Sequence, residues 1–317
     1  MANATTLPAS KHFTLQELAP GVYAAFVIEN MGAFSNGGFV DLGDEVLVID
    51  GFLTPQAARD LRQIAEEVTG HPVRYLVNTH WHGDHVRGNQ VYADTSIIST
   101  QITRDLIATY LPERLKDMLE QGPAHIQALE AALAEAKDLA ERRELENELI
   151  HVREVESTLA TVEVTLPNVT FEQKMTLHGT RRSAELITFG GGHSPSDVFV
   201  YLPDDKIMFM GDLLFVQTQP AFWNANEREW IEILERVEQF DAEQLVPGHG
   251  PLGGLADVTA TKQYIIDLLD IIQAHIESGG TEEGISDLKL PAAYESWSFG
   301  ALFHRNLQKL FAQLTQK

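Results

Sequence analysis

The sequence predicts an α+β fold with a helical insertion and a helical C-terminus, on three observations. Strand and helix signals alternate through the first hundred residues. A stretch at about 101–160, rich in Ala, Leu, Glu and Arg, has the apolar spacing of long amphipathic helices. Strand signals then return before further helices. Because the chain shows no repeat and no low-complexity linker, we expect a single domain over 1–317, with its core at about 20–255.

The N-terminal part is predicted to contain strands at 22–29, 37–43 and 45–51, with Gly43 and Asp44 turning the last two into a hairpin. A helix follows at 54–68, because Thr54 is a good N-cap and Pro55 suits the first helical position. A short strand at 74–79 then runs into the segment THWHGDH, residues 79–85. Loops that follow strands are where layered folds carry catalytic groups, so this segment is the first candidate site.

The insertion at 101–160 is predicted to form long helices, with Gly122 and Pro123 as the break between two of them. Apolar residues such as Ile126 and Leu129 recur at helical spacing. This stripe is typical of a helical hairpin packed on the core or on a second subunit, which makes a homodimer through the insertion a reasonable hypothesis. The alternative is a lid that shapes a substrate pocket.

After the insertion, strands are predicted at 169–178, 184–190, 197–203 and 206–212, then a helix at 227–238, a strand at 244–247, and C-terminal helices near 256–276 and 299–315.

Composition excludes several classes of protein. The 46 acidic and 23 basic side chains give a net charge of −23, which repels nucleic acids and disfavours a nuclease. No apolar stretch approaches the roughly 18 residues of a membrane span, and the N-terminus does not resemble a secretory signal, so we expect a cytoplasmic protein that acts on a small molecule. With no cysteine, any metal must be held by nitrogen and oxygen.

The segment 79–85 has the pattern of a metal-binding loop. In an extended segment His80 and His82 point the same way and can share one ion. Gly83 lets the backbone turn and aims Asp84 and His85 elsewhere, so one loop can serve two neighbouring metals. The alternative is a chance surface cluster, which three histidines and an aspartate directly after a strand make less plausible.

Three further candidate ligands stand at predicted strand ends. GGGHSPSD contains His193, FMGD contains Asp212 and VPGHGP contains His249. One glycine-flanked histidine is weak evidence, but three such residues in a chain that already has a metal-binding loop predict a metal centre.

HWHGDH, followed in order by GGGHSPSD, MGDLLF and PGHGP, resembles the ligand pattern of the metallo-β-lactamase superfamily, from about residue 20 to 255. The resemblance implies a four-layer αββα sandwich with the active site at one edge of its two sheets. It also implies a dinuclear zinc hydrolase, although iron or manganese would suit the same ligands.

The resemblance assigns His80, His82 and His193 to one zinc, Asp84, His85 and His249 to the other, and Asp212 to a bridging position. By the same resemblance Asp50 is an acid that orients a ligand histidine, where the alternative is an ordinary aspartate closing a turn, and Asp197 is a weaker candidate for a similar role. In the family's scheme a metal-bridging hydroxide attacks a polarised carbonyl, and Asp84 takes part in proton transfer.

Departures from the family pattern narrow the class of substrate that we expect. β-Lactamases proper carry Cys or Ser where Asp212 stands, whereas a bridging Asp is typical of the glyoxalase II, lactonase and nuclease branches. We therefore expect hydrolysis of a small ester, thioester, lactone or lactam. The alternatives are a β-lactamase with weak or promiscuous activity and a non-catalytic metal-binding protein that recruits a partner; a phosphodiesterase or nuclease is disfavoured by the charge.

The segment after Asp212 is a candidate wall of the substrate pocket, because it holds Phe222, Trp223 and Asn224 near the expected metal edge. Alternatively, Phe222 and Trp223 pack against the helix that follows. Trp81, between two candidate ligands, is expected to point away from the ion that His80 and His82 share.

Overall fold

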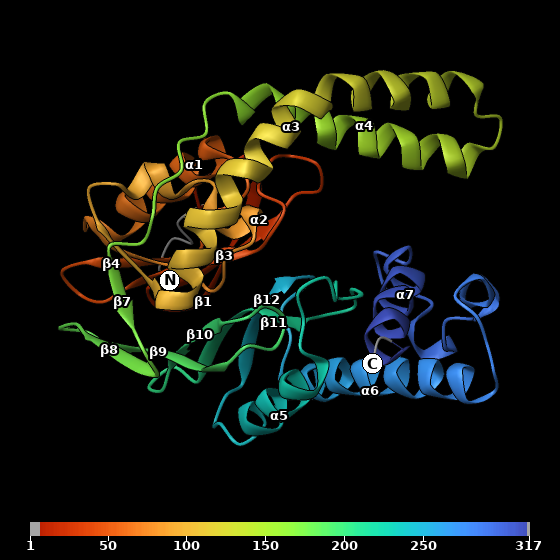
Figure 1. Cartoon of the computed structure of the whole chain (residues 1–317). Helices are drawn as coiled ribbons and strands as arrows, with labels where there is room; N and C mark the ends of the chain where they lie inside the picture. The colour runs from red at the N-terminus through yellow and green to blue at the C-terminus, as the bar shows by residue number, and fades with distance from the viewer. Residues whose placement is uncertain (1–6, 316–317) are drawn as a thin grey trace, which may run out of the picture. The chain divides into compact units, whose positions relative to one another are not determined.

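The computed structural model describes residues 7–315, which form two compact units (Figure 1). The first unit ends at Ala184 and the second begins at Glu185. The structure contains two mixed β-sheets: the first unit holds one of them whole, and the second unit holds most of the other. The expectation of a single domain over the whole chain stays a prediction.

The first unit contains a seven-stranded sheet in which the strands follow one another in chain order. Its strands are β1 (Phe13–Ala19), β2 (Val22–Val27), β3 (Gly37–Asp41), β4 (Val46–Ile49), β5 (Val73–Val77), β6 (Ser96–Thr100) and β7 (Val169–Phe171). β1 to β4 pair antiparallel, and β4 to β7 pair parallel. The predicted hairpin at Gly43 and Asp44 is confirmed, since it joins β3 to β4.

Helix α1 (Pro55–Thr69) connects β4 to β5 and confirms the predicted start. The Thr54 side chain accepts a hydrogen bond from the Ala57 backbone N–H, and Pro55 occupies the first turn. The helix buries Leu61 and Ile64 in the same apolar cluster as β4 and β5. A short helix α2 (Gly83–Val86) and a 3₁₀ turn η1 (Asn89–Tyr92) follow β5.

The insertion forms two long helices, α3 (Gln101–Glu135) and α4 (Leu139–Leu159). The predicted break at Gly122-Pro123 is wrong, because α3 runs through both residues and ends only at Glu135. Gly122 instead permits close approach of α4, since a Cβ there would lie 2.2 Å from the Glu156 carboxylate. A proline inside a helix removes one backbone hydrogen bond, and α3 changes direction along its length (Figure 1).

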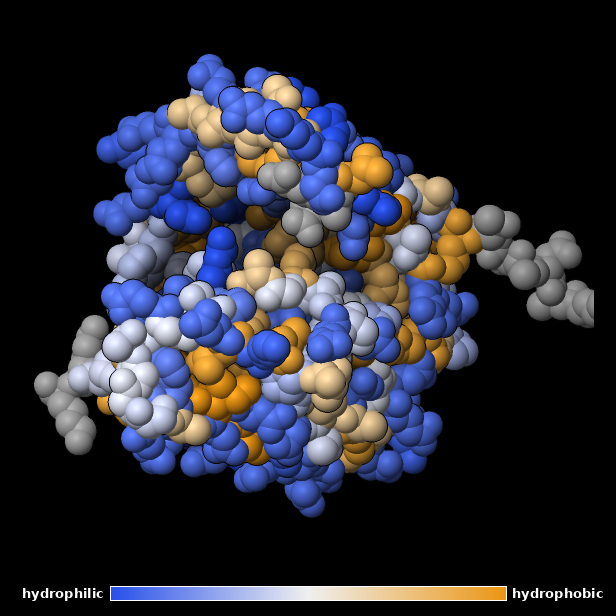
Figure 2. All heavy atoms as spheres, turned by 90° about the vertical axis from the view of Figure 1, so that its right-hand side faces the viewer, coloured by the Kyte–Doolittle hydropathy of each residue, from blue (hydrophilic) through white to orange (hydrophobic). Residues whose placement is uncertain are grey.

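The first part of α3 packs on the metal-binding loop through Ile107, Leu111 and Leu115, which cluster with Val86. The rest of α3 pairs with α4, and large apolar side chains such as Leu119 stay exposed there. The homodimer through this hairpin stays a prediction. On the face in Figure 2 hydrophilic residues predominate, with apolar residues in small groups between them, which agrees with the charge of −23.

The second sheet has five strands in the order β12-β11-β10-β9-β8, and the boundary between the units falls within β9. Its strands are β8 (Lys174–His178), β9 (Ser183–Gly190), β10 (Asp197–Leu202), β11 (Ile207–Phe215) and β12 (Gln244–His249). The strand predicted at 169–178 is corrected: a bend at Glu172 and Gln173 divides it into β7 and β8, which belong to different sheets.

The three predicted helices of this part are confirmed: α5 (Glu227–Val237), α6 (Leu255–Glu277) and α7 (Leu302–Thr315). The 3₁₀ turns η2 (Glu283–Asp287) and η3 (Ala292–Tyr294) lie between the last two. Trp230 of α5 and Tyr264 of α6 are fully buried in the core of this unit. Asn226 caps α5 by accepting from the Glu229 backbone N–H.

Sequence patterns do not predict two strands, β1 and β6. β1 has mostly part-exposed or exposed residues and pairs along one side with β2. β6 runs directly into α3, with Thr100 as the helix cap, so no turn residue marks its end. Within residues 7–315 no helix is long and apolar enough to cross a membrane. The cytoplasmic location stays a prediction.

Candidate metal centre

In the first unit, β5 delivers His80 and His82 as expected. His80 is fully buried and His82 is half-buried. Their ligand atoms lie within 4.8 Å of each other, and their ring centroids are 4.6 Å apart. The intervening Trp81 packs in the cluster formed by Val86 and α3, with its ring 5.4 Å from Tyr110. The Trp81 ring also lies 4.9 Å from the His82 ring, and residues 79–81 form a bend rather than a strand.

The next two candidate ligands, Asp84 and His85, lie in helix α2. His85 Nε2 lies 3.4 Å from Asp84 Oδ2. Gly83 is the first residue of α2, so the backbone does turn at this point, and its φ is not positive. Glycine is needed there for space: a Cβ would lie 2.7 Å from Nε of Arg87, whose side chain folds back over the loop. Burial lowers the pKa of this guanidinium to about 10, although the nearby Asp84 carboxylate favours its charged form.

Asp50 contacts both ends of this loop, at Thr79 and at His85. Its Oδ2 lies 2.7 Å from His85 Nδ1, and Oδ1 accepts the Thr79 backbone N–H at 2.8 Å. The Thr79 hydroxyl donates to Oδ2 at 2.9 Å. Asp50 has a left-handed backbone with φ of 61°, a strained conformation that is common at functional sites. These contacts suit an acid that orients His85, and this role of Asp50 stays a prediction.

The second unit brings His193, Asp212 and His249 together. Asp212 Oδ2 lies 3.1 Å from His193 Nε2, and the other oxygen, Oδ1, lies 3.5 Å from His249 Nε2. All three side chains are buried. His193 stands in the loop between β9 and β10, and His249 is the last residue of β12. Asp212 lies inside β11, where the pairing with β12 is irregular.

A glycine makes the position of Asp212 possible. A Cβ on Gly248 would lie 1.9 Å from Asp212 Oδ1, so any larger residue in β12 would push the carboxylate away. The glycine before His249 in the sequence PGHGP therefore serves the neighbouring ligand, which sequence reasoning missed.

Asp197 shapes the backbone around His193. Its Oδ2 accepts N–H groups from Gly192 at 2.8 Å and from Ser194 at 3.0 Å, the residues on either side of the histidine. Burial raises the pKa of this carboxyl, while the neighbouring imidazole and the two N–H donors oppose that shift. Asp197 therefore holds the backbone on both sides of His193.

The three residues that were predicted to line a substrate pocket differ in their burial. Phe222 is fully buried, with its ring 6.0 Å from Trp230 and 6.2 Å from Tyr264, so it packs in the core as the alternative expected. Its assignment to a substrate pocket is corrected by this burial. Trp223 and Asn224 are exposed, and the Arg305 guanidinium lies 5.9 Å from the centre of the Trp223 ring. Their role in a pocket stays a prediction.

The donor set suits a metal in both units, because it consists of imidazole nitrogens and carboxylate oxygens gathered in buried or half-buried positions. Residues 31–249 match the sequence model of the metallo-β-lactamase superfamily, and they include all seven candidate ligands. The chain belongs to this family.

Comparison with individual proteins points to the same fold. A metallo-β-lactamase type 2 from Bacteroides fragilis is 29% identical over 105 residues, which are 32% of this chain and 42% of the relative. The chain thus matches less than half of the length of that curated relative. A solved metallo-β-lactamase from Pontibacter korlensis has a TM-score of 0.58 and 20% identity, over 80% of this chain and 98% of that one.

The DIM-1 metallo-β-lactamase, solved after exposure to ceftazidime, is similar with a TM-score of 0.57 and 18% identity, over 82% of this chain and 99% of that one. These likenesses confirm the predicted fold, the metallo-β-lactamase sandwich. The family match ends at His249, so α6 and α7 lie beyond it.

The segment beyond the family match brings an aromatic ring to the candidate metal centre that sequence patterns did not indicate. Phe299 lies edge-on to His249 with ring centroids 6.2 Å apart, and 45% of it is exposed. Its φ is 60°, a left-handed conformation that is rare outside glycine. Backbone hydrogen bonds of Ser298 with Gln217 and Gln219 hold the segment in place.

Proposed function

We propose that this chain is a dinuclear zinc-dependent hydrolase that cleaves a small carboxylic derivative: an ester, a thioester, a lactone or a lactam. The observation that carries the proposal is the position of Asp212, whose two oxygens face two different histidines, His193 and His249. A carboxylate with one oxygen beside each of two imidazoles is suited to bridge two cations. A structural zinc site is usually a single closed tetrahedron and needs no such bridge.

The proposal joins the ligands of the first unit to those of the second, because the family match spans both. In this assignment the first zinc takes His80, His82 and His193, the second takes Asp84, His85 and His249, and Asp212 is shared. Nitrogen and oxygen donors also suit iron and manganese, so the native metal is part of the test.

When bound, a pair of zinc ions would supply a water whose pKa is lowered from about 15.7 towards 7, and would polarise the substrate carbonyl. The chain's own residues transfer the proton and position the ligands. Asp84, which stays part-exposed, accepts and returns a proton. Asp50 fixes the orientation of the His85 ring, and Asp197 fixes the backbone on both sides of His193.

Two observations favour a carboxylic derivative. Asp212 stands where β-lactamases proper carry Cys or Ser, and the charge of −23 opposes binding of a polyanionic phosphodiester. The second candidate is a β-lactamase with weak or promiscuous activity, because the relatives with the same fold are named metallo-β-lactamases.

Metal analysis combined with a substrate panel tests the proposal. The purified full chain is loaded with zinc and assayed on chromogenic ester, lactone, thioester, lactam and phosphodiester substrates. We expect two zinc ions per chain and turnover of at least one carboxylic substrate, with both lost in Asp212→Asn. Asp105→Asn, an exposed acid on α3, serves as the control and should behave as the wild type.

Two outcomes would overturn the proposal. Two zinc ions without turnover of any substrate would favour a non-catalytic metal-binding protein that recruits a partner. Cleavage of the phosphodiester alone would establish a nuclease instead.

A further inference from the structure

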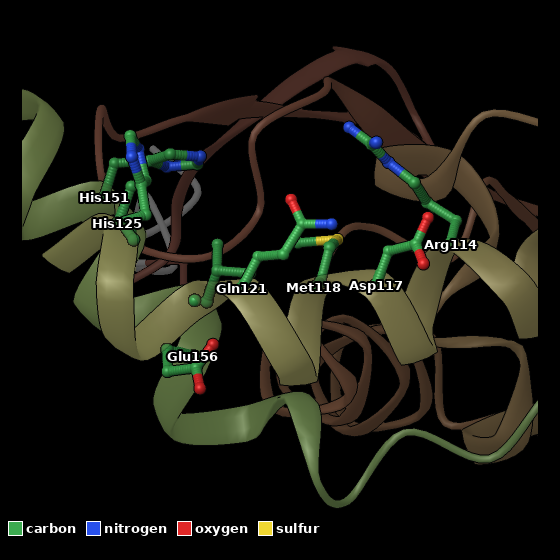
Figure 3. A pocket seen from close by; sticks show the side chains of 10 residues that line it. Arg114, Asp117, Met118, Gln121, His125, His151 and Glu156 are labelled. Carbon is green, nitrogen blue, oxygen red and sulfur yellow. The ribbon is translucent and has the colours of Figure 1, made fainter.

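A pocket of about 240 Å³ lies between α3 and α4, within the first unit (Figure 3). Figure 3 shows His125 and His151 at one end of the view and Arg114 at the other, with Met118 and Gln121 between them. Whole small-molecule sites have volumes of roughly 300–1,000 Å³. This pocket is smaller, so it has room for one part of a small molecule, such as a short chain or a single ring.

The pocket wall is mainly apolar. Met118 comes from α3, and Val152 and Val155 come from α4. The unbranched methionine side chain adapts to ligands of different shape. His151 adds an uncharged face, because burial lowers the pKa of its imidazole below the ordinary value. These residues favour an apolar occupant.

The charges at the rim do not attract an anion. The lining contains one permanent cation, Arg114, and two carboxylates, Asp117 and Glu156. Asp117 lies three residues after Arg114 on the same helix, so the two side chains are neighbours on its surface. An anionic ligand would gain little from such a rim, which leaves an uncharged group as the best fit.

Two separate contacts connect the pocket to the metal-binding loop. His151 packs against Phe34 with ring centroids 4.9 Å apart, and the next residue, Ser35, donates its hydroxyl to the Asp84 carbonyl at 2.6 Å. On the other wall, Met118 Sδ lies 3.0 Å from Nη2 of Arg87, whose side chain folds back over Gly83. Both walls therefore contact residues that pack directly on residues 83–84.

We propose that the α3–α4 pocket binds the uncharged, apolar chain or ring of the carboxylic substrate that is hydrolysed at the metal centre. This inference rests on the proposed function and adds a substrate class to it. It also assigns the helical insertion a role in substrate binding, beyond the packing of Ile107 and Leu111 on the core.

Direct binding tests the pocket without any turnover. N-hexylacetamide is used as an uncharged probe and hexanoate as its anionic counterpart, with saturation-transfer NMR on the full chain. We expect N-hexylacetamide to bind the wild type, hexanoate to bind more weakly, and Val152→Phe to abolish the signal. Ile150→Phe adds the same kind of bulk at an exposed position of α4 outside the pocket and should bind as the wild type does.

A kinetic assay is the second test: kcat/KM is measured for p-nitrophenyl esters from acetate to octanoate. In the wild type kcat/KM should rise by up to about fourfold per added methylene until the pocket is full. Val152→Phe should remove this rise, so that kcat/KM becomes nearly independent of chain length. If Val152→Phe does not fold, Gln121→Trp at the exposed rim replaces it.

The two proposals fail in different ways. Failure of N-hexylacetamide to bind, or equal binding by the wild type and a folded pocket variant, overturns the pocket proposal. Ester turnover without a chain-length effect overturns it also, and leaves the proposed function standing. Probe binding that depends on Val152, in a chain that hydrolyses no substrate, supports the pocket and overturns the proposed function.

Discussion

The Asp50 carboxylate lies 2.7 Å from Nδ1 of His85, while Nε2 of the same ring lies 3.4 Å from Asp84. A neutral histidine that donates its Nδ1–H to a carboxylate presents the lone pair of Nε2 to a metal. Asp50 also accepts two hydrogen bonds from Thr79, the residue before the first candidate ligand. One buried acid thus fixes both ends of the loop that carries four of the candidate ligands.

Asp50→Asn is expected to weaken zinc binding about 10- to 100-fold, because the amide lacks the charge that holds the His85 tautomer. Competition with a chromogenic chelator measures the affinity. Asp41→Asn is the matched control, since Asp41 is equally buried and contacts His71 and Arg181 instead of candidate ligands. An unchanged zinc affinity in Asp50→Asn would show that Asp50 only closes a turn.

Asp84→Ala is expected to reduce the bound zinc from two ions to one and to lower turnover to background, because the side chain is both a proposed ligand and the proposed proton acceptor. Plasma emission analysis of the dialysed protein gives the metal content. Wild-type rates in a variant that still holds two zinc ions would remove Asp84 from both roles.

Gly83→Ala is expected to destabilise the protein by about 1–3 kcal/mol, the usual cost of overpacking, because the new Cβ would meet Arg87 at 2.7 Å. Chemical denaturation measures the free energy of unfolding. At Gly300 the nearest atom to an added Cβ is 3.9 Å away, so Gly300→Ala controls for the change of residue type. Equal stability of Gly83→Ala and the wild type would mean that Arg87 moves aside freely.

Phe299→Gly is expected to separate stability from catalysis. Glycine adopts the left-handed φ of this position without the roughly 1–2 kcal/mol cost of other residues, so the melting temperature should stay equal or rise. Loss of the ring beside His249 should raise KM for apolar substrates more than it lowers kcat. A lower melting temperature would show that Phe299 serves packing rather than substrate binding.

Much of the fold follows from local patterns. The cap at Thr54, the turn at Gly43 and the α5 to α7 helices are set by neighbouring residues, so sequence patterns predict them. The course of α3 through Pro123 does not follow from local preference, because packing against α4 overrides the tendency of proline to end a helix. Only the pairing partners decide that residues 169–178 form two strands of different sheets.

The sequence by itself determined the candidate ligands and the family, because the ligands stand in short segments whose order and spacing are visible along the chain. The two-residue spacing of His80 and His82 also predicts that they lie together, and their rings are 4.6 Å apart. Only the tertiary structure decided what surrounds them. Gly248 makes room for a ligand on the neighbouring strand, and Phe299 reaches His249 from beyond the family match. Such contacts join residues distant in sequence, and close packing sets them where no local preference does.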